Sequence, residues 1–393
     1  MKSRNIPVLF LATALSQSGP FIVALLGGII GAELAPSPSL TSLPVALLVV
    51  GVAIFVVPAS LIMRKIGRKR GFLLAAILGT GGALLGTFAL ANDNFILFCF
   101  STMLLGMNNA FVQQYRFAAV ESVSKAFAGR AVSWVLLGGI MSAFIGPEIA
   151  KQTLGIISSN IYGGAFLVLA GLYLLSFFLL LFLENIRSQT SEIVGTGRPL
   201  GEIMKQKNFL IAIMAGAISY GSMTFIMTAT PIHMNGVGGF GLDHTAFIIQ
   251  SHVIAMFLPS LFSGILIEKL GLFRVMLSGA VLLLLSTFVG ISSIELNQFW
   301  IALVLLGLGW NFLFVGATVL LTHSYKENER FKTQAANDFI VFGVRSIASF
   351  SAGSVLFFSG WERINLIGFA FVFVTILVLS MQRRDLPKGR ATN

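Results

Sequence analysis

The chain has 393 residues, of which 56% are hydrophobic and only 10% are charged. A soluble domain carries about 25% charged residues, so the main solvent of this chain must be lipid. Its single cysteine, Cys99, excludes a disulfide framework. In a soluble protein, a net charge of +11 would indicate nucleic-acid binding. Here, however, the basic residues lie in short clusters between apolar runs. We attribute the charge to membrane topology and expect no nucleic-acid partner.

Apolar runs long enough to cross a bilayer recur along the chain. A helical span needs about 20 apolar residues, and scanning at that width predicts twelve spans. They begin near Val8, Leu40, Gly71, Phe95, Ala131, Tyr162, Phe209, His244, Leu272, Phe299, Ala335 and Arg363. The first run is too long for the apolar region of a secretory signal, so we expect a span and no cleaved leader.

The basic residues predict the orientation. If the N-terminus is cytoplasmic, 22 of the 26 Lys and Arg residues fall on the cytoplasmic side. Lys151 and Arg363 fall outside, while Arg116 and Arg345 lie within spans. The positive-inside rule therefore predicts an inner (plasma) membrane protein with both termini cytoplasmic. The longest polar stretch divides it into an N-terminal half (1–183), a linker (184–208), a C-terminal half (209–381) and a tail (382–393).

The two halves resemble one another. The segment from Ile66 to Arg70 has a counterpart 204 residues later, and Gly106-Met-Asn-Asn-Ala-Phe111 matches Gly309-Trp-Asn-Phe-Leu-Phe314 at an offset of 203. Two similar six-helix halves around a central pathway are typical of secondary transporters. We therefore expect an all-α polytopic membrane protein with twelve transmembrane helices in two pseudo-symmetric halves.

At this point the sequence resembles the major facilitator superfamily. The signature of that family between spans two and three, G-x-x-x-D-R-x-G-R-K/R-R, lies over Ser60 to Arg70, although the family's aspartate is Arg64 here. The second copy keeps an acid at Glu268 but has Leu272 in place of the arginine. The resemblance implies a gating loop made of Arg64, Gly67, Arg68, Lys69, Arg70, Arg130 and Glu268.

Two other family motifs are only partly present. The antiporter motif of span five lies over Ser133, Ser142, Gly146-Pro147 and Ala150, where small residues replace most of the glycines and still permit close helix contact. The family arginine of span four is Thr102 here, so the proton coupling assigned to that arginine is not expected in this chain.

Ionisable groups at membrane depth are the main functional candidates, because each costs about 2.5–3.5 kcal/mol to insert. Arg345 lies near the middle of span eleven, on a helical stripe with Asp338, Phe342 and Ser349. We expect a role in substrate binding, with a purely structural role for Arg345 as the alternative. The full set of predicted substrate-binding residues is Gln17, Asn109, Gln113, Arg116, Tyr220, Thr224 and Arg345.

Three groups are candidates for proton coupling: Asp338 in the inner third of span eleven, His252 in span eight and Glu148 at the outer end of span five. Each has a structural alternative, since a histidine can serve in packing and a carboxylate can face water at the interface. His252 with Met256 is insufficient as a metal site, because no carboxylate or thiol joins them. We expect no metal and no cofactor.

These features predict a secondary transporter that moves a small polar or anionic organic solute, such as a metabolite or a carboxylate siderophore, by alternating access. Protons are the simplest driver, and a monomer in the bilayer is expected. Multidrug efflux of amphipathic compounds is the alternative, favoured by 36 Phe and 13 Met. The chain has no H-E-x-x-H, G-x-S-x-G or P-loop motif, so we expect neither an enzyme nor an ATP-driven pump.

Overall fold

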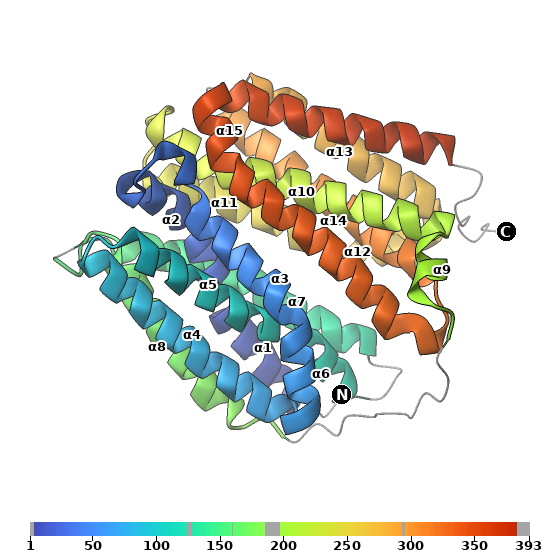
Figure 1. The fold of residues 1–393 in the computed structure, drawn as a ribbon, viewed down its shortest axis with the longest axis horizontal. Helices are drawn as coiled ribbons and strands as arrows, with labels where there is room; N and C mark the ends of the chain where they lie inside the picture. The colour runs from blue at the N-terminus through green and yellow to red at the C-terminus, as the bar shows by residue number, and fades with distance from the viewer. Residues whose placement is uncertain (1–3, 124–127, 159, 185–196, 293–294, 383–393) are drawn as a thin grey trace. The chain divides into compact units, whose positions relative to one another are not determined.

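The computed structural model describes residues 4–123, 128–158, 160–184, 197–292 and 295–382, and every regular element in these ranges is a helix (Figure 1). The helices are α1 (Asn5–Ser16), α2 (Ser18–Leu34), η1 (Pro38–Leu40), α3 (Leu43–Ile66), α4 (Arg68–Ala91), α5 (Phe95–Val112), α6 (Tyr115–Glu121), α7 (Ala128–Gln152), α8 (Gly163–Leu180), α9 (Leu200–Met204), α10 (Lys207–Gly236), α11 (Leu242–Phe257), α12 (Ser260–Leu270), α13 (Leu272–Ile291), α14 (Leu296–Thr322), η3 (Glu327–Glu329) and α15 (Arg330–Met381). The chain divides into unit 1, residues 1–189 with 231–250, and unit 2, residues 190–230 with 251–393.

Each of the twelve predicted spans falls on helical structure. Within the described ranges, nine helices are long and apolar enough to cross a membrane, or ten if the bent pair of α11 and α12 is one span. The longest helix, α15, contains two predicted spans and turns back on itself at Gly360, whose φ of 78° and ψ of 175° are not helical (Figure 1). The exact number of twelve crossings stays a prediction.

Proline explains two breaks within predicted spans. Span one is divided at Gln17 into α1 and α2. Pro20, three residues later, has no N–H to donate to the carbonyl of Ser16, which weakens the helix at this point. Span eight bends by 42° between α11 and α12, next to Pro259. There the Asn311 side chain donates to the carbonyl oxygen of Met256 at 2.6 Å, which satisfies a backbone group at the break.

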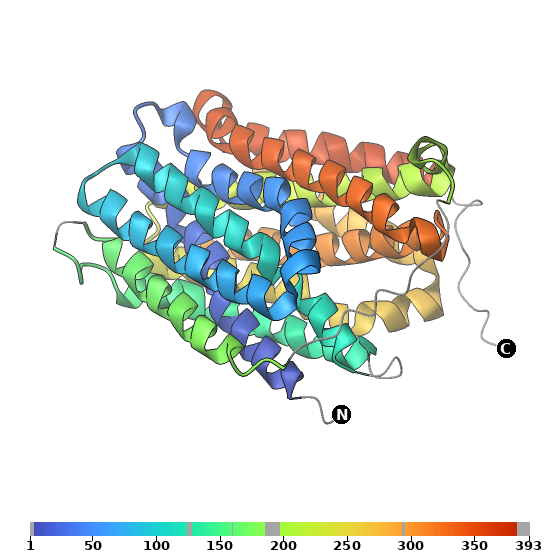
Figure 2. The same ribbon diagram turned by 60° about the horizontal axis from the view of Figure 1, so that its bottom comes forward.

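Glycine allows the helices within each unit to pack closely. In unit 1, α4 and α5 lie side by side (Figures 1 and 2), and α5 also packs on α3. A Cβ atom at Gly106 would lie 2.1 Å from the backbone oxygen of Leu48, so only glycine fits there. In unit 2, Gly309, the counterpart of Gly106, makes a close approach with Gly279 between α14 and α13, which is the counterpart of α4 rather than of α3. The repeat predicted from the sequence therefore has a packing function in both units.

The same repeat is visible in the backbone. Gly67 joins α3 to α4 with φ 87° and ψ 156°, and Gly271 joins α12 to α13 with φ 85° and ψ 154°. Residues with a side chain rarely adopt a positive φ of this kind. The two junctions therefore have nearly the same backbone conformation, 204 residues apart.

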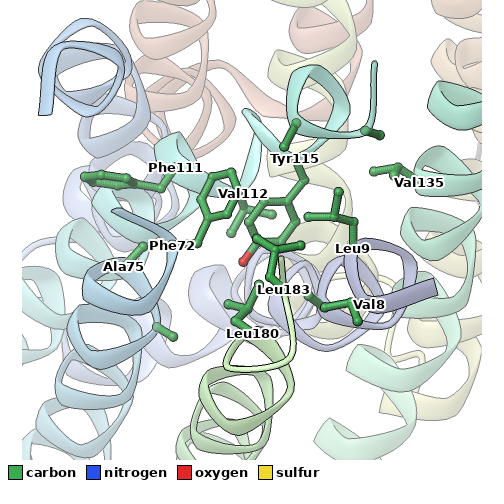
Figure 3. Close-up of a cluster of buried hydrophobic side chains, with 14 of the residues drawn as sticks. Val8, Leu9, Phe72, Ala75, Phe111, Val112, Tyr115, Val135, Leu180 and Leu183 are labelled. Atoms are coloured by element: carbon green, nitrogen blue, oxygen red, sulfur yellow. The ribbon is translucent and has the colours of Figure 1, made fainter. Parts of the chain in front are cut away.

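Unit 1 contains a buried apolar cluster, and Figure 3 shows part of its side chains. Tyr115, the first residue of α6, is 1% exposed and packs edge to face on Phe72 of α4 with ring centroids 4.6 Å apart. Leu9 of α1, Val135 of α7 and Leu180 of α8 complete its surroundings (Figure 3). Because this cluster anchors α6, it also fixes the place of Glu121 at the end of that helix.

Candidate functional site

Two polar stripes meet in unit 2. Side chains of α10 contact side chains of α15 at two places. The Arg345 Nε atom donates a hydrogen bond to the Thr224 Oγ1 atom at 3.2 Å. The hydroxyl oxygens of Thr228 and Ser349 are 3.5 Å apart. Tyr220, one turn before Thr224, contacts Phe342 with ring centroids 5.8 Å apart. The structure thus brings together three of the predicted substrate-binding residues, Tyr220, Thr224 and Arg345, from segments about 120 residues apart.

Arg345 has an unusual environment for a charge at membrane depth. Its guanidinium carbon lies 4.7 Å from the centre of the Tyr220 ring, a cation–π contact. Among the residues that the structure describes, no carboxylate forms an ion pair with Arg345. A guanidinium has five N–H donors, and Thr224 uses only the one on Nε. The others are therefore available to a hydrogen-bond acceptor of a bound solute.

Aromatic side chains surround Tyr220. Its ring packs edge to face on Trp310 and Phe314 of α14, with centroids 5.1 and 5.0 Å away. Trp310 and Phe314 are stacked on each other at 5.1 Å, and Phe257 of α11 lies 6.1 Å from Trp310. Aromatic faces beside an arginine suit a planar ring that carries hydrogen-bond acceptors.

Trp310 and Phe314 were not predicted from the sequence as site residues. Their spacing of four residues on one predicted helix puts them on one face and could have indicated a pair. The missing information was which helix lies opposite that face, and the packing of α10 on α14 supplies it.

The predicted substrate residues of the N-terminal half are more dispersed. Gln17 lies at the break between α1 and α2, and Asn109 is buried in α5, where its Oδ1 atom has no hydrogen-bond partner. Asn109 and Arg116 belong to different helices, because α5 ends at Val112 and α6 begins at Tyr115, with Gln113 in the turn between them. Arg116 is exposed and stacks on the adjacent Phe117 ring, 4.8 Å from its centre.

The three candidates for proton coupling have different surroundings. His252 is fully buried, with its Nδ1 atom 2.7 Å from the backbone oxygen of Leu303. Glu148 is bound by Lys151 at 2.9 Å and by Gln152 at 2.7 Å. Asp338 is half-buried and accepts a hydrogen bond from Asn337 at 3.1 Å. In the described ranges, no three His, Cys, Asp or Glu residues are grouped in a way that could hold a metal ion.

The predicted gating loop forms one well-defined ion pair. Arg68 donates from its Nε and Nη2 atoms to the two carboxylate oxygens of Glu121, at 2.7 and 2.6 Å, and the Lys69 ammonium donates to the backbone oxygen of Leu181 at 2.7 Å. Such bidentate arginine–carboxylate pairs are among the stronger polar contacts. Gly67 forms the turn described above, and Arg70 and Glu268 are exposed. The side chains of Arg64 and Arg130 lie outside the described part of the chain.

A second ion pair was not predicted from the sequence. The Nε and Nη2 atoms of Arg198 donate to the two carboxylate oxygens of Glu329 at 2.8 and 2.6 Å. Glu329 is 1% exposed, and the guanidinium of Arg198, followed by the backbone N–H of Lys326, holds the pKa of its carboxyl well below the ordinary value. The pair therefore stabilises the fold above the unfolded-state pKa, about 4.3, and that contribution is lost as the pH falls further.

A family model described as Major Facilitator Superfamily matches residues 9–348, and the chain belongs to that superfamily. It is a multi-pass membrane protein and a transporter of a small-molecule solute rather than an enzyme.

The chain is 41% identical over 390 residues to the riboflavin transporter RfnT of Brucella anthropi. The aligned region covers 99% of this chain and 97% of that protein. It is also similar to two uncharacterised MFS-type transporters of Bacillus subtilis. YddS is 26% identical over 371 residues, covering 90% of this chain and 85% of YddS. YdeG is 28% identical over 383 residues, covering 91% of this chain and 87% of YdeG.

Proposed function

We propose that this protein transports riboflavin, or a closely related flavin, by alternating access. The single observation that carries the proposal is the position of the Arg345 guanidinium, which lies on Tyr220 beside Trp310 and Phe314 and has no carboxylate partner among the described residues. The flavin ring is planar and aromatic, and its imide carbonyls accept hydrogen bonds. The 41% identity to a riboflavin transporter supports the same solute.

This proposal keeps the polar solute expected from the sequence. It excludes an anionic solute, because riboflavin is uncharged at neutral pH. Arginine then acts as a hydrogen-bond donor to ring carbonyls rather than as a counter-ion. Hydrogen bonds to a charged group contribute about 1.5–3 kcal/mol. We further propose a monomeric transporter in the inner membrane, with the cytoplasmic termini that the distribution of Lys and Arg predicts.

The first test measures thermal stabilisation of the purified protein by riboflavin, together with riboflavin flux into proteoliposomes. Ligand at 100 times its dissociation constant should add about 2.7 kcal/mol of stability, which gives a clear rise in Tm. Ribitol, which lacks the ring, is the matched control and should have no effect. Stabilisation by lipophilic cations but not by riboflavin would contradict the proposal and favour multidrug efflux.

We propose that Asp338 carries a coupled proton. It lies seven residues before Arg345 on the same helix, two turns from the candidate site. Glu148, by contrast, is bound by Lys151, and His252 of α11 is buried against Leu303 of α14. If this is correct, Asp338→Asn should still exchange riboflavin across proteoliposomes but lose accumulation driven by a pH gradient. A mutant that accumulates riboflavin as wild type does would show that the proton is carried elsewhere or that none is coupled.

A further inference from the structure

The two halves differ in how they use an arginine after the second span. In unit 1, Arg68 at the start of α4 forms the bidentate pair with Glu121. The corresponding position 204 residues later is Leu272, which is buried and has no charge. The second half therefore has no arginine at this position that could form the same pair.

Arg198 provides a bidentate pair of the same kind in unit 2. It comes from the segment between the two halves and binds Glu329, which lies beyond α14 just as Glu121 lies beyond α5. The carboxylate also accepts from the backbone N–H groups of Arg198 at 2.8 Å and of Lys326 at 2.9 Å. Glu329 thus has four donors and is almost completely buried.

Further contacts hold the same segment in place. The Lys332 ammonium donates to the backbone oxygen of Arg198, and the Gln206 side chain donates to the backbone oxygen of Ser324 at 2.8 Å. Gly197 has a φ of 57°, and a Cβ atom there would lie 2.7 Å from the Glu329 side chain, so the close approach requires glycine. Residues 197–206 are therefore a fixed part of unit 2.

This attachment is at the beginning of the helix that carries the candidate site. Glu329 is the residue immediately before α15, and Arg345 lies sixteen residues further along the same helix. No helix break is found between them, since the non-helical residue of α15 is Gly360. At 1.5 Å per residue the separation is about 24 Å, so a tilt at the start of α15 moves Arg345 relative to Tyr220.

We propose that Arg198 and Glu329 are a positioning pair, through which the segment between the halves holds the start of α15 and thereby the placement of Arg345 in the binding site. Neither residue contacts the solute in this proposal. The inference rests on the proposed function only in taking riboflavin as the solute that Arg345 binds.

The test compares Arg198→Ala with wild type in full-length protein and uses Lys205→Ala as the matched control. Lys205 is exposed in the same segment, so its replacement removes one positive charge without affecting Glu329. We expect Arg198→Ala to raise the Kd and the transport KM for riboflavin about tenfold, as is typical of coupling between distant groups in one protein, with Vmax little changed. Arg198→Lys keeps the positive charge but lacks the planar pair of donors that binds both carboxylate oxygens, so it should restore part of the affinity.

Hydrogen–deuterium exchange over residues 330–345 gives a measurement that does not depend on the solute. Uptake in this segment should rise in Arg198→Ala and stay at the wild-type level in Lys205→Ala. Unchanged exchange, or a wild-type Kd in Arg198→Ala, would overturn the positioning role. If wild type itself does not bind riboflavin, the proposed function is wrong, and the exchange result still decides whether the pair holds α15.

Discussion

Arg345→Gln is expected to lower riboflavin affinity and flux about 10- to 100-fold while leaving the protein folded. The reason is that the charged donors of Arg345 are the strongest polar groups at the aromatic cluster, and a hydrogen bond to a charged group contributes about 1.5–3 kcal/mol. In the absence of a carboxylate partner among the described residues, the substitution also removes the cost of an unpaired charge in the membrane. The Tm without ligand should therefore stay the same or rise.

This combination separates a binding role from a structural one. The measurement is riboflavin flux in proteoliposomes with Tm recorded with and without riboflavin, and Arg345→Lys serves as the graded control. Lysine keeps the charge but lacks the planar set of donors, so intermediate flux is expected. Normal flux in Arg345→Gln, or a large drop in Tm without ligand, would show that Arg345 serves packing only.

Tyr220→Leu is expected to raise the Kd for riboflavin about 2- to 30-fold. The Tyr220 ring lies 4.7 Å from the Arg345 guanidinium carbon and contacts Trp310 and Phe314. A cation–π contact contributes about 0.5–2 kcal/mol, and its loss would leave the guanidinium less well oriented. The measurement is riboflavin titration of the purified variants, followed by intrinsic flavin fluorescence.

Tyr220→Phe is the matched control for this prediction. It keeps the aromatic face and removes only the hydroxyl, so near-wild-type affinity is expected if the ring is what matters. Equal losses in the leucine and phenylalanine variants would instead indicate that the hydroxyl binds the solute. Wild-type affinity in both would remove Tyr220 from the site.

Much of the fold could be predicted because it depends on local pattern. Runs of apolar residues predict spans, since an unpaired backbone group in lipid is costly and helices satisfy their own. The helices are found where those runs lie, and Gly67 and Gly271 adopt the same backbone conformation at the predicted repeat. The turn at residues 113 and 114, which separates α5 from α6, is a feature that hydropathy does not reveal.

The site depends on which faces meet, and the tertiary structure decided this. Helical spacing puts Tyr220 and Thr224 on one face of their helix and Asp338 and Arg345 on one face of another, but only packing shows that Tyr220, Thr224 and Arg345 come together beside Trp310 and Phe314.

The sequence by itself thus determined a helical membrane protein with two related halves, and identified Arg345 as a charge that needs an explanation. The tertiary structure decided the neighbours of Arg345 and revealed the pairing of Arg198 with Glu329 across 131 positions of the sequence. The physical reason is that a one-dimensional pattern specifies the face on which a side chain lies, whereas its partner depends on contacts between segments far apart in the chain.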